Sequence, residues 1–350
     1  MSAVISLETV KRYATLKHGR IYTLPIAILM PHSSCNCRCV MCDIWRGNAN
    51  LQQLSEADIR GLLDSFARLG TRWVVLSGGE ALMNPNLFRL CALLKANGIR
   101  KITILSTGLL LKKHARPVID GVDEVIVSLD GSQAVHDAIR RIPDAYVKLK
   151  AGVQAVKALA PTFPISGRCV IQRLNFADWP HIVAAARDIG LDHISFLAAD
   201  VSTEAFNRPA LWDGERVAEI NLEPEQLPQL EAVFEQLVAG RAADFASGYI
   251  LESPAKLRRI VDYYLALHGR GDFPPVACNA PWVSAVVEAD GAVRPCYFHR
   301  PMGNIRQRPL ADLLNAPEEI AFRRGLDMAA DPICRKCVCT LNLRPGASVA

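Results

Sequence analysis

The sequence predicts an α/β fold in which parallel strands alternate with helices, as a barrel or as a doubly wound sheet. Apolar runs of strand type alternate with helical patterns from residue 25 to about residue 200. Alternation of this length is typical of parallel strands connected by helices. The connections after the strands are short, so the carboxyl ends of the strands lie on one face, where α/β folds usually place their chemistry.

The alternating region contains six predicted strands and five predicted helices. The strands cover residues 25–30, 73–76, 101–105, 124–127, 165–171 and 193–197, and the helices cover residues 55–69, 86–96, 112–119, 145–159 and 179–189. Ser55 lies at the N-cap position of the first helix, and Asp58 follows at the spacing of a capping box. Gly98 closes the second helix.

The alternation stops after about Asp200. Residues 201–277 are predicted to form a polar loop and two helices, at about 224–238 and 254–267. The segment 283–296 is predicted to be a β-hairpin, because an Asp290-Gly291 turn separates two β-branched runs.

Composition excludes several classes of protein. The chain has 350 residues, half of them hydrophobic, and a formal net charge of +5 that is spread along the sequence. No apolar stretch approaches the roughly 20 residues of a membrane span, and no basic stripe favours nucleic acid. The N-terminus has no pattern of a secretion signal. We therefore expect a cytoplasmic protein with neither a membrane nor a nucleic-acid partner, in which the clustered cysteines among the 11 serve metal sites rather than disulfides.

Three of these cysteines form the most specific motif of the chain. Cys35, Cys39 and Cys42 follow the first predicted strand with the spacing C-x3-C-x2-C. A cubane iron–sulfur cluster fully bound by protein takes four thiolates, so three would leave one iron open to a small molecule. The alternative is a zinc site with His32 as the fourth ligand.

A second motif follows one strand–helix unit later. Ser77-Gly-Gly-Glu80 comes directly after the strand at 73–76. Glycines allow a backbone to approach a ligand closely, and the carboxylate suits an ammonium group. With both motifs in place, the chain resembles the radical S-adenosylmethionine (radical SAM) superfamily across about residues 20–200, and the cluster interpretation is preferred to zinc.

The resemblance implies a partial (β/α)6 TIM-like barrel with a small C-terminal auxiliary-cluster domain that contains the hairpin. It implies an N-terminal extension over residues 1–20, a radical SAM core over 21–235, a helical linker over 236–277 and the auxiliary domain over 278–350. It also implies a cubane held by Cys35, Cys39 and Cys42, and cofactor contacts by Met41, Gly78, Gly79, Glu80, Ser106, Thr107 and Ser128. Asp130, in a Ser-Leu-Asp-Gly element, is a candidate catalytic acid or base, with a structural turn carboxylate as the alternative.

The C-terminal cysteines resemble the short twitch form of the auxiliary domain more than the longer SPASM form. Cys278 and Cys296 bracket the hairpin, and Cys334, Cys337 and Cys339 follow. The resemblance implies a second 4Fe–4S cluster held by Cys278, Cys296, Cys334 and Cys337, with Cys339 as an alternative to one of them. Two other interpretations stay open: a zinc ribbon-like site, and a cluster with only three ligands that binds substrate directly.

The remaining three cysteines have a structural interpretation. Cys37 lies outside the motif spacing and is expected only to pack nearby. Cys91, on an apolar helix face, and Cys169, in a strand, are expected in the core.

The resemblance implies a radical SAM oxidoreductase. It would cleave S-adenosylmethionine (SAM) to a 5′-deoxyadenosyl radical and abstract a substrate hydrogen, while the auxiliary cluster accepts an electron. The result is a dehydrogenation or a cross-link in natural-product or cofactor biosynthesis. The expected partners are a small-molecule or peptide substrate and a flavodoxin- or ferredoxin-type reductant. The alternatives are a peptide maturase whose precursor is delivered separately, since only 34 residues precede Cys35, and a non-catalytic iron–sulfur carrier or scaffold.

Overall fold

The computed structural model describes residues 6–349 and confirms an α/β fold built on a mostly parallel, open sheet. Nine strands form this sheet in the order β6-β5-β4-β3-β2-β1-β7-β8-β9. The strands of the alternating region are parallel to one another: β1 (Ile26–Leu29), β2 (Trp73–Leu76), β3 (Lys101–Ser106), β4 (Glu124–Ser128), β5 (Ile165–Ile171) and β6 (Ile194–Ala198). Each strand agrees with its predicted range to within about one residue at either end.

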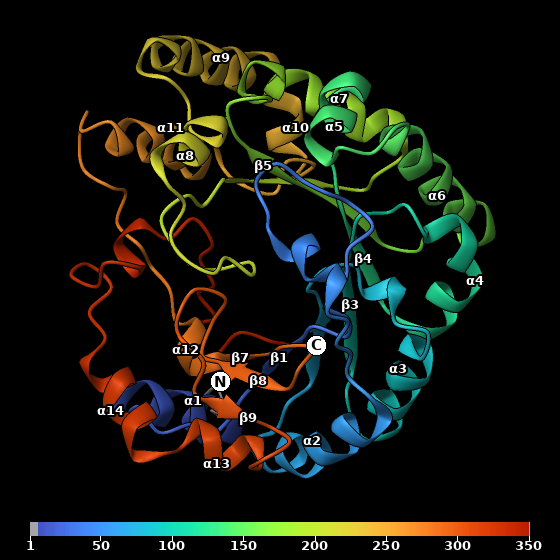
Figure 1. The fold of residues 1–350 in the computed structure, drawn as a ribbon, viewed down its shortest axis with the longest axis vertical. Coiled ribbons are helices and arrows are strands. Elements are labelled where there is room, and N and C mark those ends of the chain that lie inside the picture. The colour runs from blue at the N-terminus through green and yellow to red at the C-terminus, as the bar shows by residue number, and fades with distance from the viewer. Residues whose placement is uncertain (1–5, 350) are drawn as a thin grey trace, which may run out of the picture.

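Helices cover the outer face of this curved sheet (Figure 1). They are α2 (Glu56–Leu69), α3 (Leu87–Ala96), α4 (Leu111–Gly121), α5 (Gln133–Arg140), α6 (Ala145–Leu159) and α7 (Trp179–Ile189). The predicted capping box of α2 is present, because Ser55 accepts from the backbone of Asp58 and Asp58 accepts from the backbone of Ser55. Strand side chains such as Val74, Ile104 and Val127 are fully buried in the apolar core. Since side chains alternate along a strand, the opposite positions face the barrel interior.

The predicted hairpin extends the barrel sheet. Its strand β7 (Ser284–Val287) runs parallel to β1, with Ile26 opposite Ser284 and Leu29 opposite Val287. The strands β8 (Ala292–Arg294) and β9 (Gly303–Asn304) follow antiparallel. Gly291 has φ +89°, the left-handed conformation that the predicted turn requires. The strand before the first cysteine motif and the hairpin between two later cysteines are therefore direct neighbours.

The other helices complete the open side of the barrel and the C-terminal region. They are α8 (Gly214–Ile220), α9 (Leu227–Gly240), α10 (Ala242–Ala246), α11 (Pro254–Leu267), α12 (Ala280–Val283), α13 (Leu310–Leu314) and α14 (Pro317–Gly325). The sequence predicts α9 and α11 but not the shorter ones. It also misses α1 (Leu7–His18), whose Arg12 side chain donates to the carbonyls of Arg344, Pro345 and Ala347. Helix α1 and the segment 344–347 therefore lie side by side.

Among residues 6–349, no helix combines the length and the apolar character that crossing a bilayer requires.

Candidate cofactor and metal-cluster sites

The C-x3-C-x2-C segment is a loop at the carboxyl end of β1, and each of its motif cysteines has its own anchor. The Asn48 side chain accepts a hydrogen bond from the backbone N–H of Cys35 and donates to its carbonyl, both at 3.0 Å. The backbone N–H of Cys42 donates to the carbonyl of Cys39, and the N–H of Ile44 lies 3.4 Å from the Cys42 sulfur. These contacts fix a loop that has little regular secondary structure.

The middle cysteine is held by the end of α5. The backbone N–H groups of Arg38 and Val40, on either side of Cys39, donate to the carbonyls of Arg140 and Ile139. The Arg140 guanidinium also donates to the Cys39 sulfur at 3.3 Å. A buried cation beside this sulfur favours its thiolate form, which is the form that binds a metal.

Cys35, Cys37 and Cys39 are close enough for their thiol groups to interact. Hydrogen bonds to Cys35 and Cys39 raise the pKa of Cys37, whereas hydrogen bonding to Cys37, together with Arg140, lowers the pKa of Cys39 to about 7. Burial raises the pKa of Cys42 to about 12, a cost that a bound metal ion offsets. The donor set of Cys35, Cys39 and Cys42 therefore fits an iron–sulfur cluster.

Neither glycine of the second motif leaves room for a side chain. A Cβ atom on Gly79 would lie 2.1 Å from the carbonyl oxygen of Ser34, directly before the first cysteine. Gly78 has φ +106°, and a Cβ there would lie 2.9 Å from the Cβ of Met30. The backbone N–H of Glu80 donates to the Ser34 carbonyl at 2.9 Å. The Gly-Gly-Glu turn is thus in direct backbone contact with the cysteine loop.

Three predicted cofactor contacts form one hydrogen-bonded unit. The Glu80 carboxylate is fully buried and accepts from the Ser106 hydroxyl, the Thr107 hydroxyl and the Thr107 backbone N–H. The Leu82 N–H donates to it as well. Burial raises the pKa of Glu80, and the bonds from Thr107 and Ser106 oppose that rise. The Thr107 hydroxyl also lies 3.0 Å from the side-chain oxygen of Asn36, while the Asn36 side-chain nitrogen is buried without a protein partner.

The two other predicted contacts, Met41 and Ser128, have different neighbours. Met41 is half-buried against a second apolar cluster made of Val40, Ile139, Ala199, Val201 and Ile220. Ser128 ends β4 with its side chain half-buried, opposite Arg168 in the sheet. His32, the fourth ligand of the zinc alternative, accepts instead from the backbone of Ser34 through its Nδ1, and burial lowers its pKa.

Asp130 occupies a buried ion pair. Its carboxylate is fully buried and lies 2.5 Å from Arg140, and it accepts from the backbone N–H of Val170. Burial raises the pKa of this carboxyl, and the Arg140 charge opposes that rise. Its backbone is held on both sides, because its N–H donates to His136 and its carbonyl accepts from Asn175. All of these contacts are with the protein itself, and the acid–base role of Asp130 stays a prediction.

The five C-terminal cysteines line a single cavity. Cys278, Cys296, Cys334, Cys337 and Cys339 share it with inward-facing Ile28 of β1 and with Tyr297. Backbone N–H groups point at its sulfurs: that of Ala280 lies 3.4 Å from Cys278, and those of Phe298 and His299 bond to Cys296. Converging thiols that accept backbone N–H groups suit a buried metal cluster. Cys91 and Cys169, by contrast, are fully buried in the apolar core.

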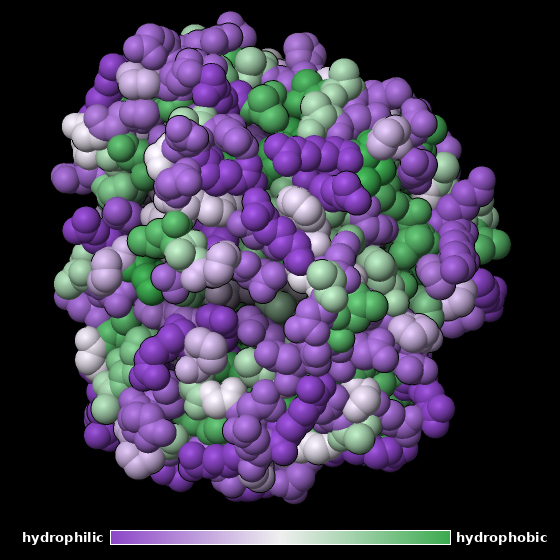
Figure 2. All heavy atoms as spheres, in the orientation of Figure 1, coloured by the Kyte–Doolittle hydropathy of each residue, from purple (hydrophilic) through white to green (hydrophobic). Residues whose placement is uncertain are grey.

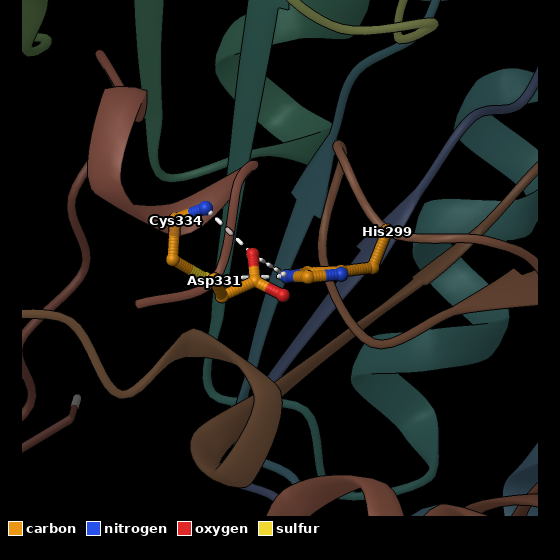
Figure 3. A group of neighbouring side chains, drawn as sticks. All are labelled: His299, Asp331 and Cys334. Carbon is orange, nitrogen blue, oxygen red and sulfur yellow. Dashed lines mark hydrogen bonds and ion pairs between the residues drawn. The ribbon is translucent and has the colours of Figure 1, made fainter. Parts of the chain in front are cut away.

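One histidine in this cavity is not expected from the sequence. The Nε2 atom of His299 lies 3.3 Å from the Cys334 sulfur and 4.0 Å from Asp331 Oδ1 (Figure 3). Asp331 Oδ1 also accepts from the backbone N–H groups of Ile333 and Cys334. Potential metal-binding atoms of these three side chains lie within 4.8 Å of one another.

A further segment covers the first cysteine loop. The indole N–H of Trp212 donates to Asp43 at 2.8 Å, and Arg216 donates to the carbonyl of Val40. The guanidinium groups of Arg208 and Arg216 stack on the Trp212 ring, 3.7 and 4.8 Å from its centroid. The bonds from Trp212 and Arg216 to the loop have no local sequence signal, because their partners lie 169 and 176 positions away in the chain.

A groove of about 450 Å³ runs beside the first cysteine loop. Its walls come from the loop segment 30–52, from Gly79, from residues 204–208 and from the hairpin tip at 288–294. Tyr297 lines both this groove and the C-terminal cysteine cavity. Figure 2 shows a hollow near the middle of this face of the molecule, with mostly hydrophilic side chains around it. The volume is within the range of small-molecule sites.

Two family models match the chain. Residues 29–196 match the model described as the radical SAM superfamily, and residues 278–338 match that of SPASM, an iron–sulfur cluster-binding domain. Both regions contain the cysteines placed above.

Curated relatives match at low identity. An AdoMet-dependent heme synthase of Methanosarcina barkeri is 24% identical over 316 residues, which cover 84% of this chain and 85% of the relative. A pre-heme d1 synthase of Dinoroseobacter shibae is 29% identical over 172 residues, covering 48% of this chain and 42% of the relative.

Among solved structures, anSMEcpe with bound AdoMet and the Cp18Cys peptide matches with a TM-score of 0.63 at 17% identity. The match covers 89% of this chain and 87% of that one. At this identity the likeness concerns the fold.

Proposed function

Because the chain belongs to the radical SAM superfamily and carries a SPASM-like auxiliary iron–sulfur domain, we propose that it is an oxidoreductase that removes a hydrogen atom and an electron from its substrate. Its cofactors are SAM and two 4Fe–4S clusters. When bound, they supply a one-electron cleavage of SAM that yields a 5′-deoxyadenosyl radical.

The observation that carries this proposal is the backbone contact between the two motifs. Gly79 and Glu80 lie directly against Ser34, and Thr107 connects the Glu80 carboxylate to Asn36 inside the cysteine loop. Groups suited to a metal cluster therefore lie directly beside groups suited to an ammonium. A simple electron carrier has no need for this second set of groups.

In this proposal, Cys35, Cys39 and Cys42 bind the first cluster. Gly78, Gly79 and Glu80 receive the amino group of SAM, with Ser106 and Thr107 holding the Glu80 carboxylate in place. Ser128 and Met41 contact the remainder of SAM. Asp130 serves the site through Arg140, as a positioning residue.

Cys278, Cys296, Cys334 and Cys337 bind the auxiliary cluster, with Cys339 as the alternative to one of them. Four thiolates leave no iron for substrate, which suits electron transfer. Loss of a hydrogen atom and then of one electron oxidises the substrate by two electrons, and the proton leaves to a base or to water.

The groove between the cysteine loop and the hairpin tip is the proposed substrate site, because it reaches Tyr297 at the edge of the auxiliary cavity.

We propose a small molecule of cofactor or natural-product biosynthesis as substrate. A relative that matches most of this chain is called a heme synthase, so tetrapyrrole precursors are the first compounds to test. A separately delivered peptide is the second candidate. A flavodoxin or ferredoxin in the cytoplasm is the proposed reductant.

The test is SAM cleavage by the anaerobically purified and reconstituted protein with dithionite, followed as 5′-deoxyadenosine by mass spectrometry. Iron near eight per chain is expected, at about four per cubane. Variants C35A, C39A and C42A should each abolish cleavage, whereas C91A, which removes a core thiol, should retain it. Absence of 5′-deoxyadenosine from the wild-type protein would show that it is a carrier or scaffold.

The auxiliary cluster has its own test. The double variant C334A/C337A should lose about half of the iron and still form 5′-deoxyadenosine, but it should not convert the substrate. Full conversion by this variant would refute the electron-acceptor role.

A further inference from the structure

His299 connects two of the cysteines in the auxiliary cavity. Its backbone N–H bonds to the Cys296 sulfur, and its imidazole Nε2 lies 3.3 Å from the Cys334 sulfur (Figure 3). Cys296 ends the hairpin, whereas Cys334 comes from the loop 35 residues beyond His299. One residue thus contacts a sulfur on each of the two segments that meet in this cavity.

The imidazole is held in place by its surroundings. His299 is buried, and its ring packs edge-on against Phe322 of α14 with centroids 5.0 Å apart. The His299 carbonyl accepts from Arg294 at 3.0 Å, which fixes the backbone. Together these contacts fix the position of the ring beside the Cys334 sulfur.

Asp331 has a different role in this group. Its Oδ1 accepts from the N–H groups of Ile333 and Cys334 at 3.0 and 2.8 Å, which shapes the turn that carries Cys334. The same oxygen lies 4.0 Å from His299 Nε2, beyond hydrogen-bond distance. The contact of the imidazole is therefore with the sulfur.

We propose that His299 donates its Nε2–H to the Cys334 sulfur of the auxiliary cluster and thereby raises the reduction potential of that cluster. This inference rests on the proposed function, because it assumes that Cys334 binds a cubane. Each iron of a cubane takes one protein ligand, so Cys334 and His299 do not share an iron. A hydrogen bond withdraws electron density from the thiolate and stabilises the reduced cluster. The consequence is an auxiliary cluster that accepts an electron more readily.

The experiment is an EPR-monitored redox titration of the reconstituted full-length protein. H299M removes the donor, and the auxiliary potential is expected to shift to a more negative value while that of the first cluster stays unchanged. H299Q retains an N–H at similar reach and should return the potential toward the wild-type value. H181N, which replaces an exposed histidine of α7, is the control and should leave the potential unchanged.

Equal potentials in H299M and the wild-type protein would overturn the proposal. Equal negative shifts in H299M and H299Q would also overturn it, because the donor would then be irrelevant. If H299M does not assemble the cluster, wild-type protein labelled with 15N-histidine decides the question by pulsed EPR. A weak nitrogen coupling with an exchangeable deuteron is expected, whereas a strong coupling would identify His299 as an iron ligand.

A mononuclear metal is the remaining outcome that would refute the proposal. In that case about four iron atoms and one zinc would be found per chain, and the zinc would be lost in both H299M and D331N. None of these measurements requires turnover. A shifted potential without 5′-deoxyadenosine would refute the proposed function and leave this inference intact, and 5′-deoxyadenosine without the shift would do the reverse.

Discussion

The Arg140 guanidinium donates to the Cys39 sulfur at 3.3 Å and forms an ion pair with Asp130 on its other side. The Arg140 and Asp130 side chains are 8% and 0% exposed. Removing one partner of such a pair leaves an unpaired buried charge. The contact thus couples the stability of the β4–α5 connection to the geometry of the cysteine loop.

We expect R140M to lower the free energy of unfolding by about 3–5 kcal/mol, because Asp130 is left buried and charged. The double variant D130N/R140M should recover part of this loss, since no charge remains unpaired. Thermal and denaturant unfolding measure the stability of both variants. R116M breaks an exposed pair with Asp120 and should change stability by less than about 1 kcal/mol. Additive losses in the double variant would contradict this account.

A methyl group on Gly79 should disturb the cysteine loop. The added Cβ would lie 2.1 Å from the Ser34 carbonyl, so G79A is expected to lower the iron bound per chain and to abolish SAM cleavage. G61A is the matched control, because a Cβ at Gly61 meets nothing within 4 Å and that glycine lies inside α2. There, alanine should stabilise the helix by about 0.5–1 kcal/mol. Normal iron content in G79A would show that the loop adjusts.

Replacing Cys37 should leave the first cluster in place. Cys37 is buried beside Cys35 and Cys39, and these neighbours raise the pKa of its thiol. The C37A variant is therefore expected to keep its iron and to form 5′-deoxyadenosine at close to the wild-type rate, in contrast to C39A. Iron analysis and product yield compare the two. If C37A lost the cluster as completely as C39A, Cys37 would have to be counted as a ligand.

Acid should destabilise the protein through His136. Burial, together with the Arg140 charge, lowers the pKa of His136 to about 3. The unfolded chain therefore binds more protons than the folded protein below the ordinary pKa of about 6.5, and stability falls as the pH falls from there toward 3. At pH 5 the loss from this group is roughly 2 kcal/mol.

The measurement is the melting temperature of the reconstituted protein at pH 7.5 and at pH 5. H136N keeps an acceptor for the Asp130 backbone N–H but does not titrate, so its melting temperature should fall less on acidification. His181, exposed on α7, provides the control H181N, which should behave like the wild-type protein. Equal acid sensitivity in H136N and wild type would count against this assignment.

Much of the barrel could be predicted from local sequence pattern. Strands such as β2 and β5 and helices such as α6 and α11 have the predicted boundaries, because their apolar periods and end signals are local. The short helices α5 and α13 were missed because their apolar pattern spans too few turns to stand out. The pairing of β7 with β1 joins residues more than 250 positions apart, and no local signal indicates it.

The site residues also differ in how far the sequence could predict them. The sequence motifs point to the three cysteines and Glu80 as candidates, but not to the residues that hold them. Arg140 lies 101 positions from the sulfur that it contacts, and Asn48 and His299 also reach their cysteines only through the fold. Asp130 belongs to a recognisable motif, yet its carboxylate is committed to Arg140.

The shared sheet also fixes the distance between the two cysteine-bearing segments, over which an electron would tunnel. β1 carries the first cysteine loop at its end and places Ile28 in the wall of the second cavity, while β7 is bonded to it along its whole length. Four strand residues span on the order of 13 Å, and a ladder of backbone hydrogen bonds does not stretch. The shared ladder therefore holds the two cysteine-bearing segments in a fixed relation along β1 and β7. In the proposed function, electron flow between the two clusters would then depend on their relative potentials and on the molecule that lies between them.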